Sequence, residues 1–230
     1  MNDRPHRSDV LVSVEKENHS PGHVRRPIAD PAWKSPLAWA VLLVVLFIGL
    51  FSDLASKSWA FENVANQPVV LNYDEVVSGQ MHPPFHESVK VLPWGLLDFH
   101  LVLNRGAVFG IGQGGRAIFM MFTVIAVIVA ICVFGWWTHK SSHLAHIGIA
   151  MILAGGIGNL YDRVSVGAVR DFLHMFPGWN LPFGMNWPGG NAEVFPWVFN
   201  IADVLLLAGM GLLLIHVHYS GKEDSAKETS

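Results

Sequence analysis

The chain has few charged residues and a single cysteine, and each shortage excludes a class of protein. Asp, Glu, Lys and Arg make up 14% of its 230 residues, whereas soluble domains carry about 25%. Cys132 alone supports neither an intrachain disulfide nor a zinc cluster. A net charge of −3, with no basic patch, does not fit a nucleic-acid partner. Because 51% of the residues are hydrophobic, the composition indicates a multi-span membrane protein.

Four apolar runs are each suited to crossing a bilayer, which takes about 20 residues of helix. These runs are residues 36–52, 117–137, 144–160 and 195–218. The second run has no charge in 21 residues and ends in Trp136 and Trp137, as expected for aromatic side chains at a membrane interface. The pattern predicts an all-α membrane protein with four transmembrane helices.

The runs define one membrane domain, residues 36–218, with a polar segment on each side of it. Residues 1–35 contain several prolines, and residues 219–230 are polar, so we expect both to be disordered tails. Residues 89–91 and 99–103 are β-branched or alternating and predict two short strands.

The distribution of Lys and Arg orients the spans. Four spans place both tails on one side, and that side carries nine Lys and Arg against six on the other. Because basic residues are enriched in cytoplasmic segments, both termini are expected in the cytoplasm.

Polar residues gather at the opposite, outer end of the spans. Asp53 and Lys57 follow the first run and, being four apart, share one helix face. Asn104 precedes the second run, in a glycine-rich segment. A charged side chain in a transmembrane helix costs roughly 2.5–3.5 kcal/mol on insertion scales, so such groups usually face a cavity or a partner.

The third and fourth runs contribute most of these residues. Asn159 comes at the end of the third run, and four ionisable side chains follow it: Asp162, Arg163, Arg170 and Asp171. Asn200 and Asp203 are three apart near the start of the fourth run. If that helix begins at Phe195, Asp203 lies about 12 Å along it, which disfavours a capping role.

Asp171 and Asp203 fit the chemistry of an aspartic protease. They are 32 positions apart and can meet in space. Two adjacent carboxylates share one proton, so one can activate water while the other polarises a carbonyl group. The asparagines can orient the pair or bind substrate, and Asp162 with Arg163 is expected to fix the loop.

Five segments, in order, resemble the lipoprotein signal peptidase (signal peptidase II) family. They are Asp53 with Lys57, residues 104–109 (Asn-Arg-Gly-Ala-Val-Phe), residues 158–163 (Gly-Asn-Leu-Tyr-Asp-Arg), residues 169–172 (Val-Arg-Asp-Phe) and residues 199–203 (Phe-Asn-Ile-Ala-Asp). The match covers about residues 37–216. The N-terminal tail and the loops at residues 61–98 and 174–196 are longer than is usual in the family.

The resemblance implies a four-span aspartic endopeptidase with a small extracytoplasmic β-element, in the bacterial inner membrane. Its activity would be removal of the signal peptide from a prolipoprotein, just before the diacylglyceryl-modified cysteine, near the outer leaflet. Asp171 and Asp203 would be catalytic. The other matched polar and glycine positions would bind substrate or support the dyad: Asp53, Lys57, Asn104, Gly106, Asn159, Asp162, Arg163 and Asn200. No metal or cofactor is implied, and a monomer in contact with lipid is expected.

Two other classes of function remain open from the residues alone. A small transporter or proton channel could use the same carboxylates as a relay, although it would need ionisable groups spread across the membrane. A non-catalytic relative could bind lipoprotein without cutting it.

Overall fold

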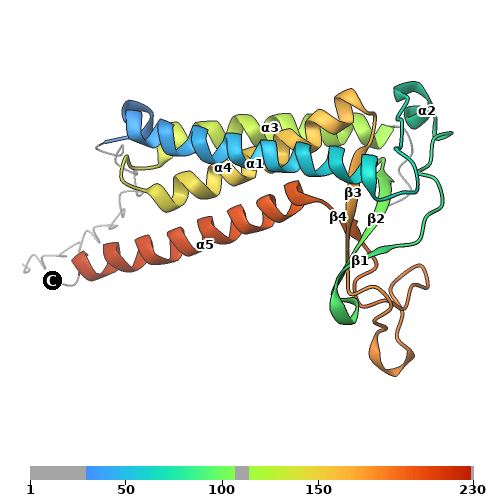
Figure 1. The fold of residues 1–230 in the computed structure, drawn as a ribbon. Helices are drawn as coiled ribbons and strands as arrows, with labels where there is room; N and C mark the ends of the chain where they lie inside the picture. Colours follow the sequence, from blue (N-terminus) through green and yellow to red (C-terminus); the bar gives the residue numbers. More distant parts are fainter. Residues whose placement is uncertain (1–29, 107–113, 229–230) are drawn as a thin grey trace, which may run out of the picture.

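A bundle of four long helices carries a small antiparallel sheet at one end (Figure 1). The computed structural model describes residues 30–106 and 114–228. The long helices are α1 (Pro36–Asn63), α3 (Gly114–Trp137), α4 (His143–Ser165) and α5 (Ile201–Glu228). The strands are β1 (Val89–Leu92), β2 (Leu97–Asn104), β3 (Val169–Met175) and β4 (Val198–Phe199). We call the two ends of the bundle the sheet end and the terminal end.

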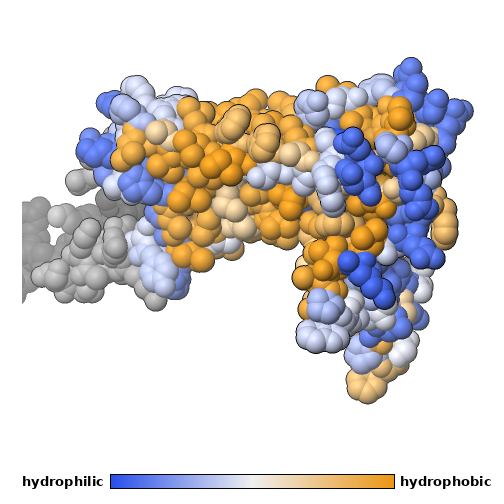
Figure 2. Space-filling view, in the orientation of Figure 1, coloured by the Kyte–Doolittle hydropathy of each residue, from blue (hydrophilic) through white to orange (hydrophobic). Residues whose placement is uncertain are grey.

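Each long helix contains a stretch long and apolar enough to cross a membrane: Pro36–Asn63, Ala117–Trp137, His143–Ser165 and Ile201–Ser220. Figure 2 shows apolar residues over the length of the bundle and hydrophilic residues at its ends. The expected fold class, four spans with a small β-element, is therefore confirmed. The chain is a multi-pass membrane protein.

Local sequence explains where the first helix begins. Ser35 Oγ accepts a hydrogen bond from the backbone N–H of Ala38 (3.2 Å), and Pro36 occupies the first helical turn. The helix runs to Asn63, well past the expected end at residue 52. Asp53 and Lys57 therefore lie within α1, one turn apart on one helix face, as their spacing predicted.

The fourth span begins later than the sequence predicted. Residues 195–200 are not helical, and two of them, Val198 and Phe199, form strand β4. Because α5 begins at Ile201, Asp203 lies in its first turn instead of about 12 Å along the helix. Hydropathy could not locate this boundary, since a buried strand and a helix start are equally apolar.

Part of each predicted tail lies within the described structure. Asp30 and Lys140 form a salt bridge (2.9 Å), and the Ala32 N–H donates to the Thr138 carbonyl (2.9 Å), so the start of the described chain is attached to the turn between α3 and α4. At the other terminus, α5 continues to Glu228 instead of ending at residue 218. Residues 1–29 and 229–230 lie outside the described part of the chain.

The sheet has the order β1-β2-β3-β4, with all neighbours antiparallel. The two predicted strands correspond to β1 and β2, whereas β3 and β4 were not expected. In the register of β2 with β3, Val102 lies opposite Asp171 and Asn104 opposite Val169. A cluster of apolar side chains, among them Phe61, Leu101 and Phe172, packs the sheet against the end of α1. This packing fixes Asp171 relative to the bundle.

Candidate active site

The polar residues predicted for the site converge at the sheet end, where α1, α4, β3 and the start of α5 meet. Most of them are buried, namely Asp53, Lys57, Asn159, Asp162, Asp171 and Asn200, and so is Arg170, which was not predicted for the site. Buried charged groups need partners, and the contacts below account for them.

Lys57 occupies the centre of this cluster. Its ammonium nitrogen lies 2.8 Å from Asp53 Oδ2, 2.9 Å from Asn159 Oδ1 and 3.4 Å from Asp162 Oδ2. Lysine only donates hydrogen bonds, so Asn159 must present its oxygen to Lys57 and its amide nitrogen in the opposite direction. That nitrogen donates to Asp203 Oδ1 (3.0 Å).

Asp53 joins the first and last spans. Its Oδ1 accepts the backbone N–H of Ala202 (2.8 Å), one of the free amide groups in the first turn of α5. Gly158 makes this approach possible, because a Cβ atom at that position would lie 2.3 Å from Asp53 Oδ2. Glycine in the Gly-Asn segment is therefore required by packing.

Asn200 and Asp203 form a reciprocal cap at the start of α5. The Asp203 N–H donates to Asn200 Oδ1 (3.2 Å), and the Asn200 N–H donates to Asp203 Oδ2 (3.2 Å). The sequence argument against capping was wrong, because it placed the helix start too early. Asp203 lies where the helix dipole favours a negative charge.

Asn200 also connects the two aspartates. Its side-chain nitrogen donates to Asp171 Oδ1 (2.6 Å) and to Asn159 Oδ1 (3.2 Å). Asp171 on β3 and Asp203 on α5 are thus held by a shared set of asparagine amides. The structure brings together the two carboxylates that the sequence paired.

Asn104 and Gly106 support Asp171 from β2. The Gly106 N–H donates to Asn104 Oδ1 (3.0 Å), and the Asn104 side chain hydrogen-bonds Asp171. Gly106 has φ +82°, a conformation that favours glycine, and a Cβ atom there would lie 3.0 Å from the Phe119 ring. The rest of this motif, residues 107–109, lies outside the described residues.

Burial and, after it, the nearby charge of Asp203 raise the pKa of Asp171 to about 7, although the hydrogen bonds from Asn200 and Asn104 and the charge of Lys57 act to lower it. Near neutral pH, Asp171 is therefore present in both protonated and ionised forms. This is the behaviour expected of one member of a carboxyl pair that shares a proton.

Asp162 pairs with Arg170 instead of its neighbour Arg163. Asp162 accepts three hydrogen bonds from Arg170: one from its backbone N–H (2.9 Å), one from Nε (3.1 Å) and one from Nη2 (2.8 Å). The sequence predicted that Asp162 pairs with Arg163 to fix the loop. That partner was wrong, because Asp162 pairs with Arg170. Arg170 appeared in the sequence as one of four clustered ionisable residues, but only the fold gives it Asp162 as its partner.

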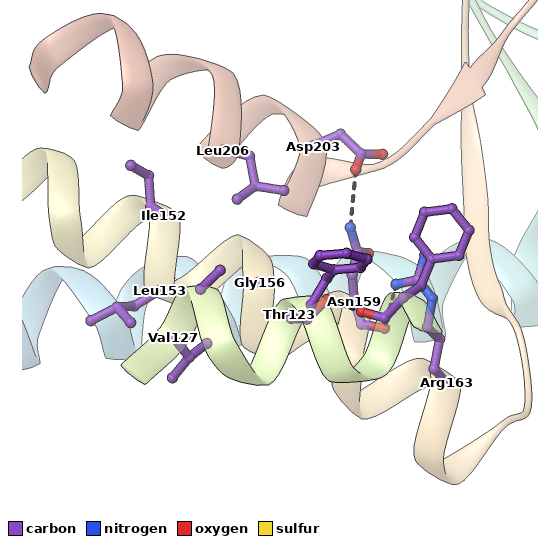
Figure 3. Close-up of a pocket in the computed structure, with 12 residues that line it drawn as sticks. Thr123, Val127, Ile152, Leu153, Gly156, Asn159, Arg163, Asp203 and Leu206 are labelled. Atoms are coloured by element: carbon purple, nitrogen blue, oxygen red, sulfur yellow. Dashed lines mark hydrogen bonds between the residues drawn. The ribbon is translucent and has the colours of Figure 1, made fainter. Parts of the chain in front are cut away.

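Arg163 faces a pocket in the bundle. Its guanidinium donates to the Asn159 carbonyl (3.1 Å) and lies over the Phe119 ring (5.7 Å), and Nε has no hydrogen-bond partner among the described residues. This pocket, about 360 Å³, lies between α3, α4 and α5. Figure 3 shows its polar end, formed by Asn159, Arg163 and Asp203, and apolar side chains along the rest of it.

A second hollow, about 440 Å³, lies on the sheet. Its lining includes Asn104 and Asp171 together with Pro196, Trp197 and Val198. Asp203 thus lines the hollow in the bundle, and Asp171 lines the hollow on the sheet. No group of His, Cys, Asp and Glu within residues 30–106 and 114–228 is arranged to hold a metal ion.

The family model described as signal peptidase (SPase) II matches residues 44–219. The chain belongs to the signal peptidase II family. It is therefore a membrane peptidase. The lipoprotein signal peptidase of Shewanella piezotolerans is 31% identical over 205 residues, covering 86% of this chain and 98% of that protein. The lipoprotein signal peptidase of Shewanella pealeana is 29% identical over 200 residues, covering 85% and 95%.

Two solved structures described as bacterial membrane enzymes, at 2.3 and 1.9 Å resolution, are similar in fold. They have a TM-score of 0.50 and sequence identities of 22% and 23%. They cover 84% and 81% of this chain, and 94% and 96% of their own chains. This likeness supports the four-span arrangement with its sheet.

Proposed function

We propose that this signal peptidase II family member is an aspartic endopeptidase that cuts bacterial prolipoproteins just before the diacylglyceryl-modified cysteine. The observation that carries the proposal is an apolar pocket within the bundle whose polar end contains Asp203, with Asp171 held beside it through Asn200. A lipid-attached peptide has the matching chemistry, because its acyl chains are apolar and its scissile amide is polar.

In the proposed reaction, Asp203 is the base and Asp171 holds the shared proton. Asp203 removes a proton from water, and the water oxygen attacks the scissile carbonyl carbon. Asp171 donates a hydrogen bond to the carbonyl oxygen as negative charge develops there. When the C–N bond breaks, the proton taken by Asp203 passes to the leaving amine nitrogen. The step uses no metal or cofactor.

The remaining polar residues hold this geometry. Lys57, through Asn159, directs an N–H toward Asp203, and Asn104 directs one toward Asp171. Arg163 has donor capacity at the pocket and is suited to bind the substrate carbonyl groups. The hollow on the sheet, lined by Asp171 and Trp197, would receive the peptide that follows the modified cysteine.

A proton relay is less consistent with this arrangement. The charged residues of the four spans, namely Asp53, Lys57, Glu62, Asp162, Arg163 and Asp203, all lie toward the sheet end. Toward the terminal end the core is apolar, apart from Thr138 and His146. No chain of ionisable groups crosses the described bundle.

The decisive experiment is processing of a synthetic diacylated precursor by the purified protein. We expect cleavage before the lipidated cysteine, and no cleavage by Asp171→Asn or Asp203→Asn variants that remain folded. A precursor without the diacylglyceryl group serves as the matched substrate control and should be cut poorly. Wild-type protein that binds the precursor without cutting it would instead indicate a non-catalytic relative.

We further propose that the protein acts as a monomer in the bacterial inner membrane, with the sheet end outside and both termini in the cytoplasm. A Gln80→Cys variant in a Cys132→Ser background tests the orientation, because Gln80 is exposed near the sheet end. Labelling of intact cells by an impermeant thiol reagent is expected. Labelling only after lysis would invert the topology.

A further inference from the structure

Two turns on the sheet side of the molecule share the sequence proline–aromatic–glycine. Pro93–Gly95 joins β1 to β2, and Pro182–Gly184 lies in the long loop between β3 and β4. The central residues, Trp94 and Phe183, are 83% and 98% exposed. We call Pro93–Gly95 together with residues 176–192 the aromatic arm.

The backbone of the arm holds these aromatic residues in an unfavourable conformation. Trp94 has φ +59°, Phe183 has φ +61°, and Phe176 in the same arm has φ +55°. Within residues 30–106 and 114–228, these are the only residues other than glycine with positive φ. The left-handed region costs such residues roughly 1–2 kcal/mol, and it recurs at functional sites. A glycine would fit each position more easily, so the exposed ring itself needs an explanation.

The two parts of the arm form one unit. Trp179 Nε1 donates to the Trp94 carbonyl (2.9 Å), and the Phe176 N–H donates to the Leu96 carbonyl (3.2 Å). The Phe176 and Trp179 rings are in contact, with centroids 5.4 Å apart. The turn that carries Trp94 is therefore attached to the base of the loop that carries Phe183.

The arm is rich in aromatic residues and carries no charged side chain. Residues 176–192 contain no Asp, Glu, Lys, Arg or His, and besides Phe183 they expose Trp179 and Met185. A water-facing loop with this composition would be an aggregation hazard. Aromatic residues without charge are instead typical of the boundary between a membrane and water.

The position of the arm matches that boundary. The sheet runs across the long axis of the bundle, and the arm extends sideways beyond the start of α5 (Figure 1). In Figure 2 the side of this projection that faces the bundle is orange and pale, whereas the opposite side is largely blue. Leu207, which is exposed on α5, belongs to the neighbouring membrane-facing surface.

We propose that the aromatic arm is a second membrane anchor, which inserts Trp94 and Phe183 into the lipid headgroup region beside the bundle. The occupant of this surface is the lipid of the same bilayer that the spans cross. Since the arm has no cationic residue, its insertion needs no anionic lipid. The anchor holds the sheet, and with it Asp171, at a fixed height on the membrane.

Site-directed fluorescence in vesicles of neutral phosphatidylcholine tests this proposal. In a Cys132→Ser background, Phe183→Cys and Trp94→Cys variants carry an environment-sensitive fluorophore. The matched control is Asp74→Cys, an exposed position on the hydrophilic helix α2 (Tyr73–Ser78), which also lies at the sheet end. We expect blue-shifted emission at both arm positions and at least about twofold more quenching by spin-labelled lipid than at the control.

Two results would overturn the anchor. One is emission at position 183 that matches Asp74→Cys and does not respond to spin-labelled lipid. The other is a blue shift that occurs without lipid quenching and disappears when each nanodisc holds a single chain. That result would mean that a second copy of the chain, and not lipid, covers the arm in vesicles. Neither result depends on peptidase activity, so the anchor and the proposed reaction can fail separately.

Discussion

The interior of the bundle changes character from the sheet end to the terminal end. At the sheet end it contains charged and amide side chains joined by hydrogen bonds, with Lys57 between Asp53 and Asp162. At the terminal end a tightly packed apolar cluster includes Leu42, Phe134 and Ile149. Apolar packing stabilises a fold at little cost, whereas buried ions must offset their desolvation. The contrast separates an end that is packed for stability from the end that contains the proposed site.

The largest expected effect is a loss of cleavage activity without a loss of folding, caused by a substitution at the sheet end. Asp203→Asn keeps the side-chain shape but removes the proposed base, so the rate of precursor cleavage should fall by about four orders of magnitude. The matched variant at the other end is Phe134→Ala, which should leave cleavage unchanged at temperatures where it is folded. Comparable rates for wild type and Asp203→Asn would remove the proposed dyad.

Replacing Asp162 should destabilise the protein more than replacing its sequence neighbour. Asp162→Asn leaves Arg170 buried without its carboxylate, and we expect a loss of about 3 kcal/mol in the free energy of unfolding. Thermal unfolding of a double-mutant cycle measures this. Asp162→Asn and Arg170→Gln should be strongly non-additive, whereas Asp162→Asn and Arg163→Gln should be nearly additive. The reverse result would restore the pairing expected from sequence.

The contact between α4 and α5 can be tested with two glycines. A Cβ atom at Gly155 would lie 2.3 Å from the Ala202 carbonyl oxygen, so Gly155→Ala should cost about 2 kcal/mol of stability and displace Asp203. The control is Gly211→Ala on α5, where a Cβ atom would meet nothing within 4 Å. It should be neutral or slightly stabilising in thermal unfolding. Equal losses for the two variants would contradict the close approach.

The smallest effect concerns pH. Because the pKa of Asp171 is raised to about 7, the cleavage rate should fall about tenfold per pH unit well above neutrality, as its proton is lost. The free energy of unfolding should also fall as pH rises.

The folded-state pKa of Asp171 exceeds its unfolded value, so the stabilising contribution of Asp171 is present at low pH and is lost as pH rises through 7. Asp171→Asn should remove the part of the decline in stability that comes from Asp171. If the variant and the wild type show the same dependence of the free energy of unfolding on pH, the raised pKa of Asp171 is contradicted.

Much of this architecture follows from local sequence. Long apolar runs predict the spans, since leaving water depends on the summed hydropathy of consecutive residues. The strands β3 and β4 were missed for a physical reason. Val169–Phe172 is buried on both faces, so it lacks the alternation that marks a half-buried strand, and it contains Arg170 and Asp171.

The sequence by itself determined that this chain crosses a membrane four times and that two remote aspartates are available for one site. Only the tertiary structure decided which groups meet. Adjacent residues such as Asp162 and Arg163 point in different directions from one helix, so their partners depend on helix rotation and on strands far along the chain. For the same reason, the reciprocal cap that Asn200 and Asp203 form could be recognised only once the fold had fixed where α5 begins.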